Sequence, residues 1–117
     1  MQVKSLLDNA TAVGPGKQHT LHPDDSNRGI TVAVGGIAGA VAAVVQYQVS
    51  NDNGATWATR MEFANLAGTS TLTAPVTDSD TDPNGPFPLV RGNIVSMTPG
   101  AKVSMAVCAA ASGRGLA

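Results

Sequence analysis

Acidic side chains alternate near the middle of the C-terminal half of the sequence, at Asp78, Asp80 and Asp82. Carboxylates at this spacing open the calcium loop of an EF-hand, which also needs glycine at its sixth position and a bidentate glutamate at its twelfth. This sequence has Pro83 and Leu89 at those two positions. An EF-hand is therefore excluded, and two interpretations stay open: weaker calcium binding by an irregular loop, or a solvated acidic loop.

Two histidines, His19 and His22, precede Asp24 and Asp25, and all four are metal-ligand types. In a strand, residues three apart point to opposite faces, so this spacing favours solvated turn residues over a metal site. Only these histidines could serve as a catalytic base, and neither Cys108 nor any serine lies in a nucleophile-elbow pattern. Residues 35–39 also lack the lysine and hydroxyl residue of a phosphate-binding loop. We expect no enzymatic activity and no cofactor.

The most specific motif is a turn pattern formed by Ser50, Asp52, Gly54, Thr56 and Trp57. It resembles the Asp-box hairpin of sialidases and many other β-proteins. In such a turn the aspartate accepts backbone N–H bonds, the glycine adopts positive φ, and the tryptophan folds back over the hairpin. Sialidases repeat the box around a propeller, whereas this chain of 117 residues contains one copy. The motif therefore predicts a structural hairpin and not glycosidase chemistry.

These side chains must be positioned by strands, because β-branched residues alternate with polar ones and glycine or proline interrupts nearly every helical pattern. Strands are expected at residues 17–21, 29–34, 41–50, 55–63, 69–73, 89–97 and 102–109. The segments 41–50 and 55–63 form one predicted hairpin, and 89–97 and 102–109 form a second. Residues 74–86, rich in aspartate and proline, are expected to be a loop.

This spacing of short strands predicts an all-β fold, a seven- or eight-stranded antiparallel β-sandwich of jelly-roll or immunoglobulin-like topology. We expect three parts: an extended N-terminal arm at 1–16, a single sandwich domain at 17–111, and a flexible tail at 112–117.

The composition restricts the core and the partners. Aromatic residues make up 3% of the chain, which predicts a thin core and stabilisation by self-association. Cys108, within an apolar run, is expected to be a buried small hydrophobe. A net charge of −1 with scattered basic residues argues against nucleic acid as a partner. The N-terminus lacks the apolar run of a signal peptide, and residues 30–45 are too short and too glycine-rich to span a membrane.

Three segments together resemble small virion proteins of tailed bacteriophages: residues 6–16 (LLDNATAVGPG), 44–52 (VVQYQVSND) and 89–98 (LVRGNIVSMT). Within that group the chain is similar in size to capsid decoration, or cement, proteins. The resemblance implies a β-sandwich on the outside of an icosahedral capsid, made in the host cytoplasm, that cements neighbouring capsomers without catalysis. Its implied partners are the major capsid protein and further copies of itself, as a dimer or trimer.

Three regions are expected to contact partners: the N-terminal arm, the polar face of residues 44–50, and the acidic loop. The candidate contact residues are Val3, Leu6, Leu7, Gln46, Gln48, Asp78, Asp80 and Asp82. Two alternatives stay open, a tail or head–tail component of the same fold and a carbohydrate-binding module. The second would need exposed aromatic rings, whereas Trp57 is assigned to the hairpin and Tyr47 is expected to face inward.

Overall fold

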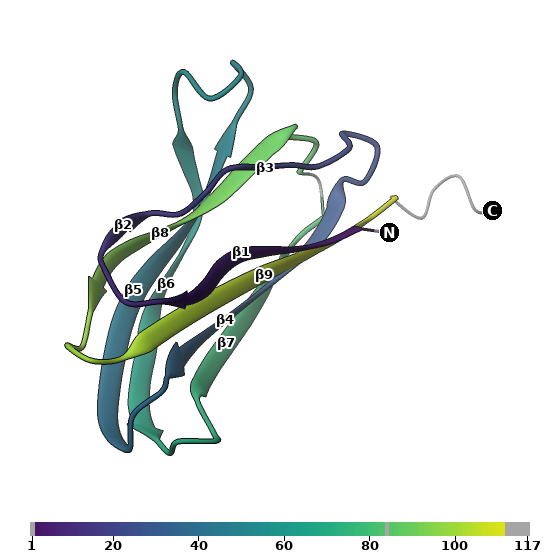
Figure 1. Ribbon diagram of the computed structural model, residues 1–117. Coiled ribbons are helices and arrows are strands. Elements are labelled where there is room, and N and C mark those ends of the chain that lie inside the picture. The colour runs from purple at the N-terminus through teal and green to yellow at the C-terminus, as the bar shows by residue number, and fades with distance from the viewer. Residues whose placement is uncertain (1, 84, 112–117) are drawn as a thin grey trace.

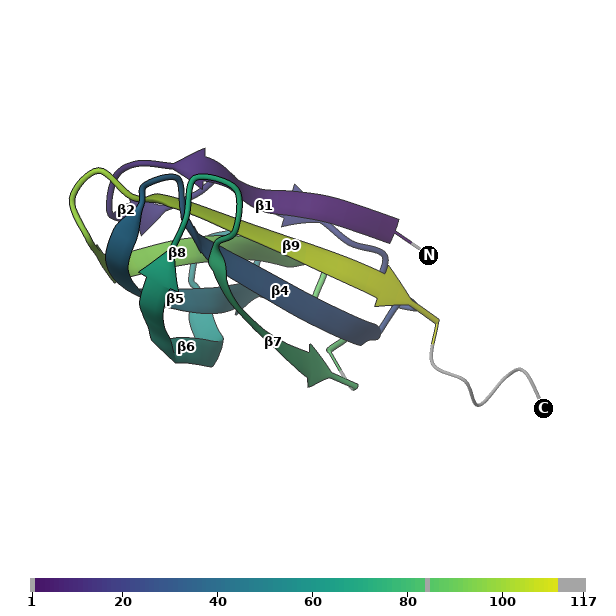
Figure 2. The same cartoon turned by 90° about the horizontal axis from the view of Figure 1, so that it is seen from below.

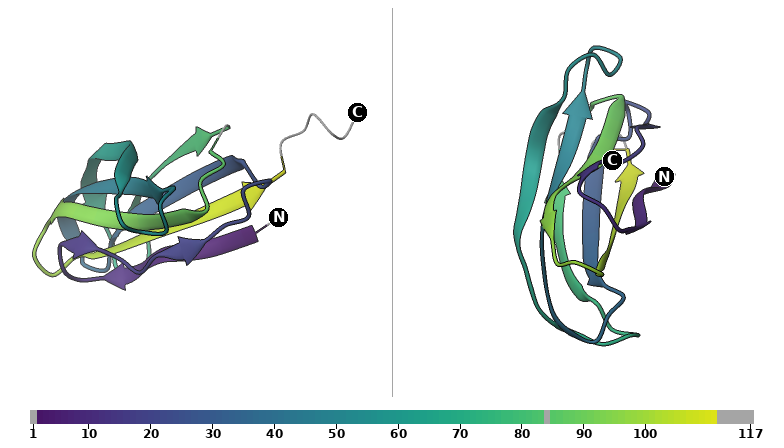
Figure 3. Two further views of the ribbon diagram at one scale, coloured as in Figure 1. Left: turned by 90° about the horizontal axis from the view of Figure 1, so that it is seen from above. Right: turned by 60° about the vertical axis from the view of Figure 1, so that its left-hand side comes forward.

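The computed structural model describes residues 2–83 and 85–111, which form nine β-strands and no helix. The strands build two antiparallel sheets that pack face to face as a sandwich (Figure 1, and nearly edge-on in the right panel of Figure 3). The predicted all-β antiparallel sandwich is confirmed. The predicted tail, residues 112–117, lies outside the described residues.

The first sheet has the order β1-β9-β4-β7, and Figure 2 shows these strands side by side. Its strands are β1 (Gln2–Ala10), β9 (Lys102–Ala110), β4 (Asn27–Gly35) and β7 (Val76–Asp82). The second sheet has the order β2-β8-β5-β6, and β3 also pairs with β8. Its strands are β2 (Gly14–Pro15), β3 (His19–Thr20), β8 (Leu89–Met97), β5 (Gly39–Ser50) and β6 (Ala58–Ser70).

The strand order selects the jelly-roll alternative. In an immunoglobulin-like sandwich the last two strands are neighbours in one sheet. Here β8 and β9 lie in opposite sheets, and β9 lies between β1 and β4. The prediction that residues 89–97 and 102–109 form a hairpin is therefore wrong, although both strands exist. The other predicted hairpin is confirmed as β5 and β6, which pair along most of their length.

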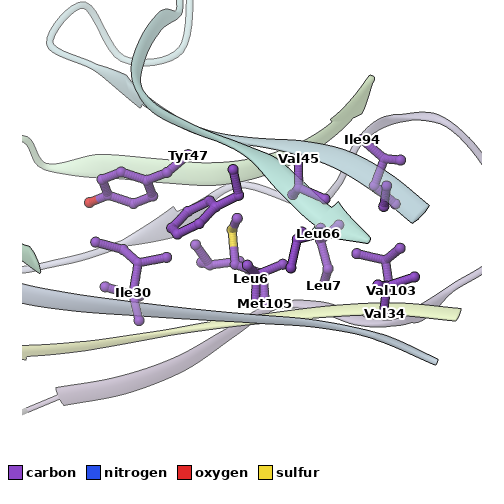
Figure 4. Packing of buried hydrophobic residues seen from close by; sticks show 14 of the residues in the cluster. Leu6, Leu7, Ile30, Val34, Val45, Tyr47, Leu66, Ile94, Val103 and Met105 are labelled. Carbon is purple, nitrogen blue, oxygen red and sulfur yellow. The ribbon is translucent and has the colours of Figure 1, made fainter. Parts of the chain in front are cut away.

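The core lies between the sheets and is built by the alternation of apolar and polar residues along each strand (Figure 4). Small and branched aliphatic side chains fill most of it, with Tyr47 and Phe63 as its buried aromatic residues. The buried hydrophobic cluster comprises Leu6, Leu7, Leu21, Ile30, Val32, Val34, Val41, Ala43, Val45, Tyr47, Val49, Phe63, Leu66, Val90, Ile94, Ala101, Val103, Met105, Val107 and Ala109.

The N-terminal segment belongs to the sandwich and is not an arm outside it. Strand β1 pairs with β9 from Gln2 onward, and its register shifts between Ser5 and Leu7. This bulge adds one residue to β1, so the consecutive side chains of Leu6 and Leu7 both enter the core, where they are 3% and 5% exposed. Neither leucine is available as the partner contact that we expected.

A glycine on β8 makes room for Leu7. A Cβ atom at Gly92 would lie 2.8 Å from Leu7 Cγ and 3.1 Å from Met105 Sδ. Real Cβ contacts are not this short, so Gly92 allows the two sheets to approach each other at this point.

Residues 74–86 are not a loop throughout, because β7 occupies Val76–Asp82. Strand β7 pairs with β4 from Val34↔Val76 to Arg28↔Asp82. Aspartate is rare in strands, but β7 lies at a sheet edge, where charged side chains that point inward discourage pairing with another chain. Backbone pairing with β4 therefore overrides the local composition.

Two smaller predictions are also corrected. Residues 71–73 are not a strand: β6 ends at Ser70, and the Thr71 side chain then closes a turn by accepting the Ala74 N–H at 3.0 Å. Cys108 is exposed and not buried, because its neighbours Val107 and Ala109 point into the core and strand alternation turns the thiol outward.

Candidate interaction surfaces

The outer face of the second sheet carries a hydrogen-bonded polar network of Gln46, Gln48, Glu62, Arg91 and Asn93. Gln46 lies directly opposite both Glu62 on β6 and Asn93 on β8, and Gln48 lies opposite Arg91. Gln46 Oε1 accepts from Gln48 Nε2 at 3.1 Å and from Asn93 Nδ2 at 3.0 Å. Gln46 Nε2 donates to Glu62 at 3.1 Å, and Arg91 Nε donates to Gln48 Oε1 at 2.8 Å. The expected polar face of residues 44–50 is therefore an ordered surface that spans three strands.

The predicted Asp-box turn connects β5 to β6 and projects beyond the end of the sandwich (Figure 1). Ser50 Oγ donates to Asp52 Oδ1 at 2.7 Å and accepts the Gly54 N–H at 3.0 Å. The Thr56 N–H donates to Asp52 Oδ1 at 2.9 Å, and the Thr56 hydroxyl donates to Oδ2. Asn53 and Gly54 have φ values of 62° and 88°, as such a turn requires.

These donors stabilise the charged form of Asp52. The Thr56 hydroxyl, then the Thr56 N–H and the Ser50 hydroxyl, lower the pKa of this carboxyl from 3.8 to about 2. The carboxylate is satisfied within its own turn, which is a structural role. The sequence prediction of a structural turn at these residues agrees with this geometry.

Trp57 links the turn to the polar network. The Arg91 guanidinium lies over the indole ring, 4.3 Å from its centroid, in a cation–π contact. The ring is half-buried and also lines an open groove of about 260 Å³ between the turn and Phe87. Two of the few aromatic side chains in this sequence therefore line one surface groove.

A group of charged residues at the other edge of the sandwich is used internally. The carboxylate of Asp82 is 4% exposed and forms a bidentate ion pair with Arg60, at 2.9 Å to Nε and 3.1 Å to Nη2. Arg60 also lies over Phe87, 5.2 Å from the ring centroid. Arg28 is fully buried and donates to the Tyr47 hydroxyl at 3.5 Å. Asp82 is therefore not a partner contact, whereas Asp78 and Asp80 are exposed on β7.

The outer face of the first sheet has the opposite chemistry, since its central rows carry no charged side chain. One row across the strands is Val3, Cys108, Gly29 and Thr81, and the next is Ser5, Ala106, Thr31 and Ser79. A third row adds Ser104, Ala33 and Thr77. We call these residues the neutral face. Sequence analysis missed it, although the small residues that alternate with the core positions of β4 and β9 were its signal.

The predicted metal-ligand types do not converge. His19 lies on β3 and His22 in the following turn, where its Nδ1 accepts the Asp24 N–H at 3.1 Å. Within residues 2–83 and 85–111, no group of three or more histidine, cysteine, aspartate or glutamate side chains is placed to hold a metal ion. No helix long and apolar enough to cross a membrane occurs in the part of the chain that the structure describes.

Comparison with known proteins gives one structural similarity to report. No protein-family model matches the sequence, and no curated protein matches it. The chain is similar to the crystal structure of the SPBc2 prophage-derived protein YomS, with 19% identity over 91% of this chain and 90% of that chain. The TM-score is 0.48. At this level of similarity the match identifies neither a partner nor a function.

Proposed function

We propose that this protein is a structural component of a tailed-phage virion that binds the outside of an icosahedral capsid and cements neighbouring capsomers. The proposal includes no catalytic step. It rests on the resemblance of three sequence segments to small virion proteins and on the architecture, a flat sandwich that offers a broad sheet face on each side.

The observation that carries the proposal is the polar network on β5, β6 and β8. Its side chains hold one another in place, so binding a large partner costs them little conformational freedom. The network uses one N–H of each of the amides of Gln46, Gln48 and Asn93, and each amide nitrogen carries two hydrogens. The remaining donors point to the same side of the sheet. We assign this surface to the major capsid protein.

Cryo-electron microscopy of purified particles tests the proposal directly. Hundreds of ordered copies on the shell, with the β5–β8 face against it, would support the cement role. A few copies at one vertex or on the tail would replace it with the tail or head–tail alternative. Particles without this chain would contradict any virion role.

A binding assay with particles stripped of the protein tests the assigned surface. The double variant Gln46→Ala, Gln48→Ala should lose particle binding, because it removes the centre of the network. Lys17→Ala, an exposed residue between β2 and β3, is the matched control and should bind as the wild type does. Equal binding of both variants would move the capsid contact to another surface.

Carbohydrate binding is a second candidate, favoured by the groove that Trp57 and Phe87 line. Aromatic side chains beside polar groups are a common setting for sugar rings. Trp57 is the sole tryptophan, so its fluorescence reports on this groove alone. Titration with host-surface oligosaccharides should change the emission saturably in the wild type and not in Phe87→Ala. No change with any of them would remove this candidate.

A further inference from the structure

We propose that two copies of this chain associate through their neutral faces, related by two-fold symmetry. The proposal does not depend on the capsid role, because it concerns the opposite side of the sandwich from the polar network. It also replaces our expectation from sequence that the polar face of residues 44–50 pairs with a second copy.

The neutral face has the chemistry of a surface that can be covered without cost from buried charge. Its side chains are hydrogen, methyl, hydroxyl, thiol and isopropyl groups, and burying them leaves no ion without a partner. Charged residues occur at its border. Asp8 borders the shallow groove between Ser5 and Ser104, and Lys102 lies at the end of the sheet, opposite Gly35.

Large apolar side chains border this face at both ends of its strands. Leu72 is 75% exposed and Val3 is 66% exposed, the highest values among the exposed large hydrophobic residues. Val3 lies in the row of Cys108 and Gly29. Leu72 lines a groove with Ala33 at the other end of the sheet. Exposed apolar groups that border an uncharged face are characteristic of a protein–protein contact.

The area agrees with a specific dimer. Strands β4 and β9 are each nine residues long. Four strands spaced about 4.8 Å apart and about 30 Å long give roughly 600 Å² for one face, and two such faces give roughly 1,200 Å². Stable specific interfaces bury about 1,200–2,000 Å² in total, so this face alone reaches the lower end of that range.

A second copy fits this face better than a charged partner does. Small side chains let two sheets approach to about 10 Å, the usual distance between packed sheets. An identical uncharged face meets that requirement from both sides, and a two-fold contact closes on itself without forming a filament. The gain also offsets a core that contains few aromatic residues.

Sedimentation velocity on the purified chain tests the proposal. The wild type should sediment as a dimer of the 11.7 kDa chain. Thr31→Arg places a guanidinium group in the middle row of the face and should give a monomer, with dimerisation at least about 100-fold weaker, because like charges meet in one interface. Ala64→Arg is the matched control on exposed β6, in the other sheet, and should remain a dimer.

Cys108 supplies a second measurement that needs no variant, since its thiol is exposed and lies on the neutral face. Its rate of reaction with a thiol reagent should fall as the protein concentration rises through the Kd of the dimer. A wild type that stays monomeric up to about 0.1 mM, far above a micromolar Kd, would overturn the proposal. So would a thiol rate independent of concentration, or a dimer that survives Thr31→Arg and is lost in Ala64→Arg.

Discussion

Truncation of Leu7 tests whether the N-terminal segment is part of the folded domain. Leu7 is 5% exposed and packs between the sheets, next to Gly92 and Gly16, where no side chain can extend into the space left by a smaller residue. Replacement of a buried leucine by alanine costs about 2–5 kcal/mol, and the loss grows with the cavity that remains. Because both glycine neighbours leave the cavity open, we expect Leu7→Ala to lower the free energy of unfolding by about 3–4 kcal/mol.

Urea denaturation followed by far-ultraviolet circular dichroism measures this loss, at one fixed protein concentration because any dimer adds to stability. The midpoint should fall by about 1–3 M urea if the slope is about 1–3 kcal/mol/M, with the slope itself unchanged. Val3→Ala, on the same strand but 66% exposed, is the control and should stay within about 0.5 kcal/mol of the wild type. If Leu7→Ala is as stable as Val3→Ala, the segment does not pack as described and is an arm after all.

Three further predictions follow from the contacts of single residues. Gly92→Ala should destabilise the fold by about 1–3 kcal/mol in the same denaturation assay, because the new methyl group would overlap Leu7, whereas Gly29→Ala has no heavy atom within 4 Å of its Cβ position and should be tolerated. Asp82→Asn should cost about 1–3 kcal/mol by weakening the bidentate pair with Arg60, and Asp80→Asn, exposed on the same strand, should cost less than about 0.5 kcal/mol. Folding lowers the pKa of Asp52 from 3.8 to about 2, so the unfolded chain binds more protons between these values, and the stability from this turn is present above pH 3.8 and lost as the pH falls toward 2; Asp52→Asn should remove that part of the pH dependence, and an unchanged difference between the two proteins from pH 5 to pH 2 would contradict the assignment.

Local patterns predicted the elements that depend on local chemistry. The Asp-box turn needs an aspartate, a glycine and a hydroxyl residue at fixed spacing, and all of its hydrogen bonds form within residues 50–56. The two-residue alternation of β4, β5, β8 and β9 likewise identified which side chains face the core. The same alternation applied to Cys108 would have placed its thiol outside, because the residue lies between two inward positions.

The candidate surfaces were less accessible from sequence. Gln46 and Gln48 were predicted to lie on one face, but their partners Asn93 and Arg91 come from a strand more than forty residues away. No local pattern specifies that β8 lies beside β5. The neutral face requires four strands in register, which is a property of the assembled sheet.

The sequence by itself determined an all-β sandwich, its main strands, and the turn between β5 and β6, since period-two hydrophobicity and turn chemistry act between near neighbours. Tertiary structure alone decided the jelly-roll order, the entry of Leu6 and Leu7 into the core through a β-bulge, and the strand formed by the aspartate-rich residues of β7. Each of these depends on backbone hydrogen bonds to a strand distant in sequence, and such bonds outweigh the weak local preferences of the residues that make them.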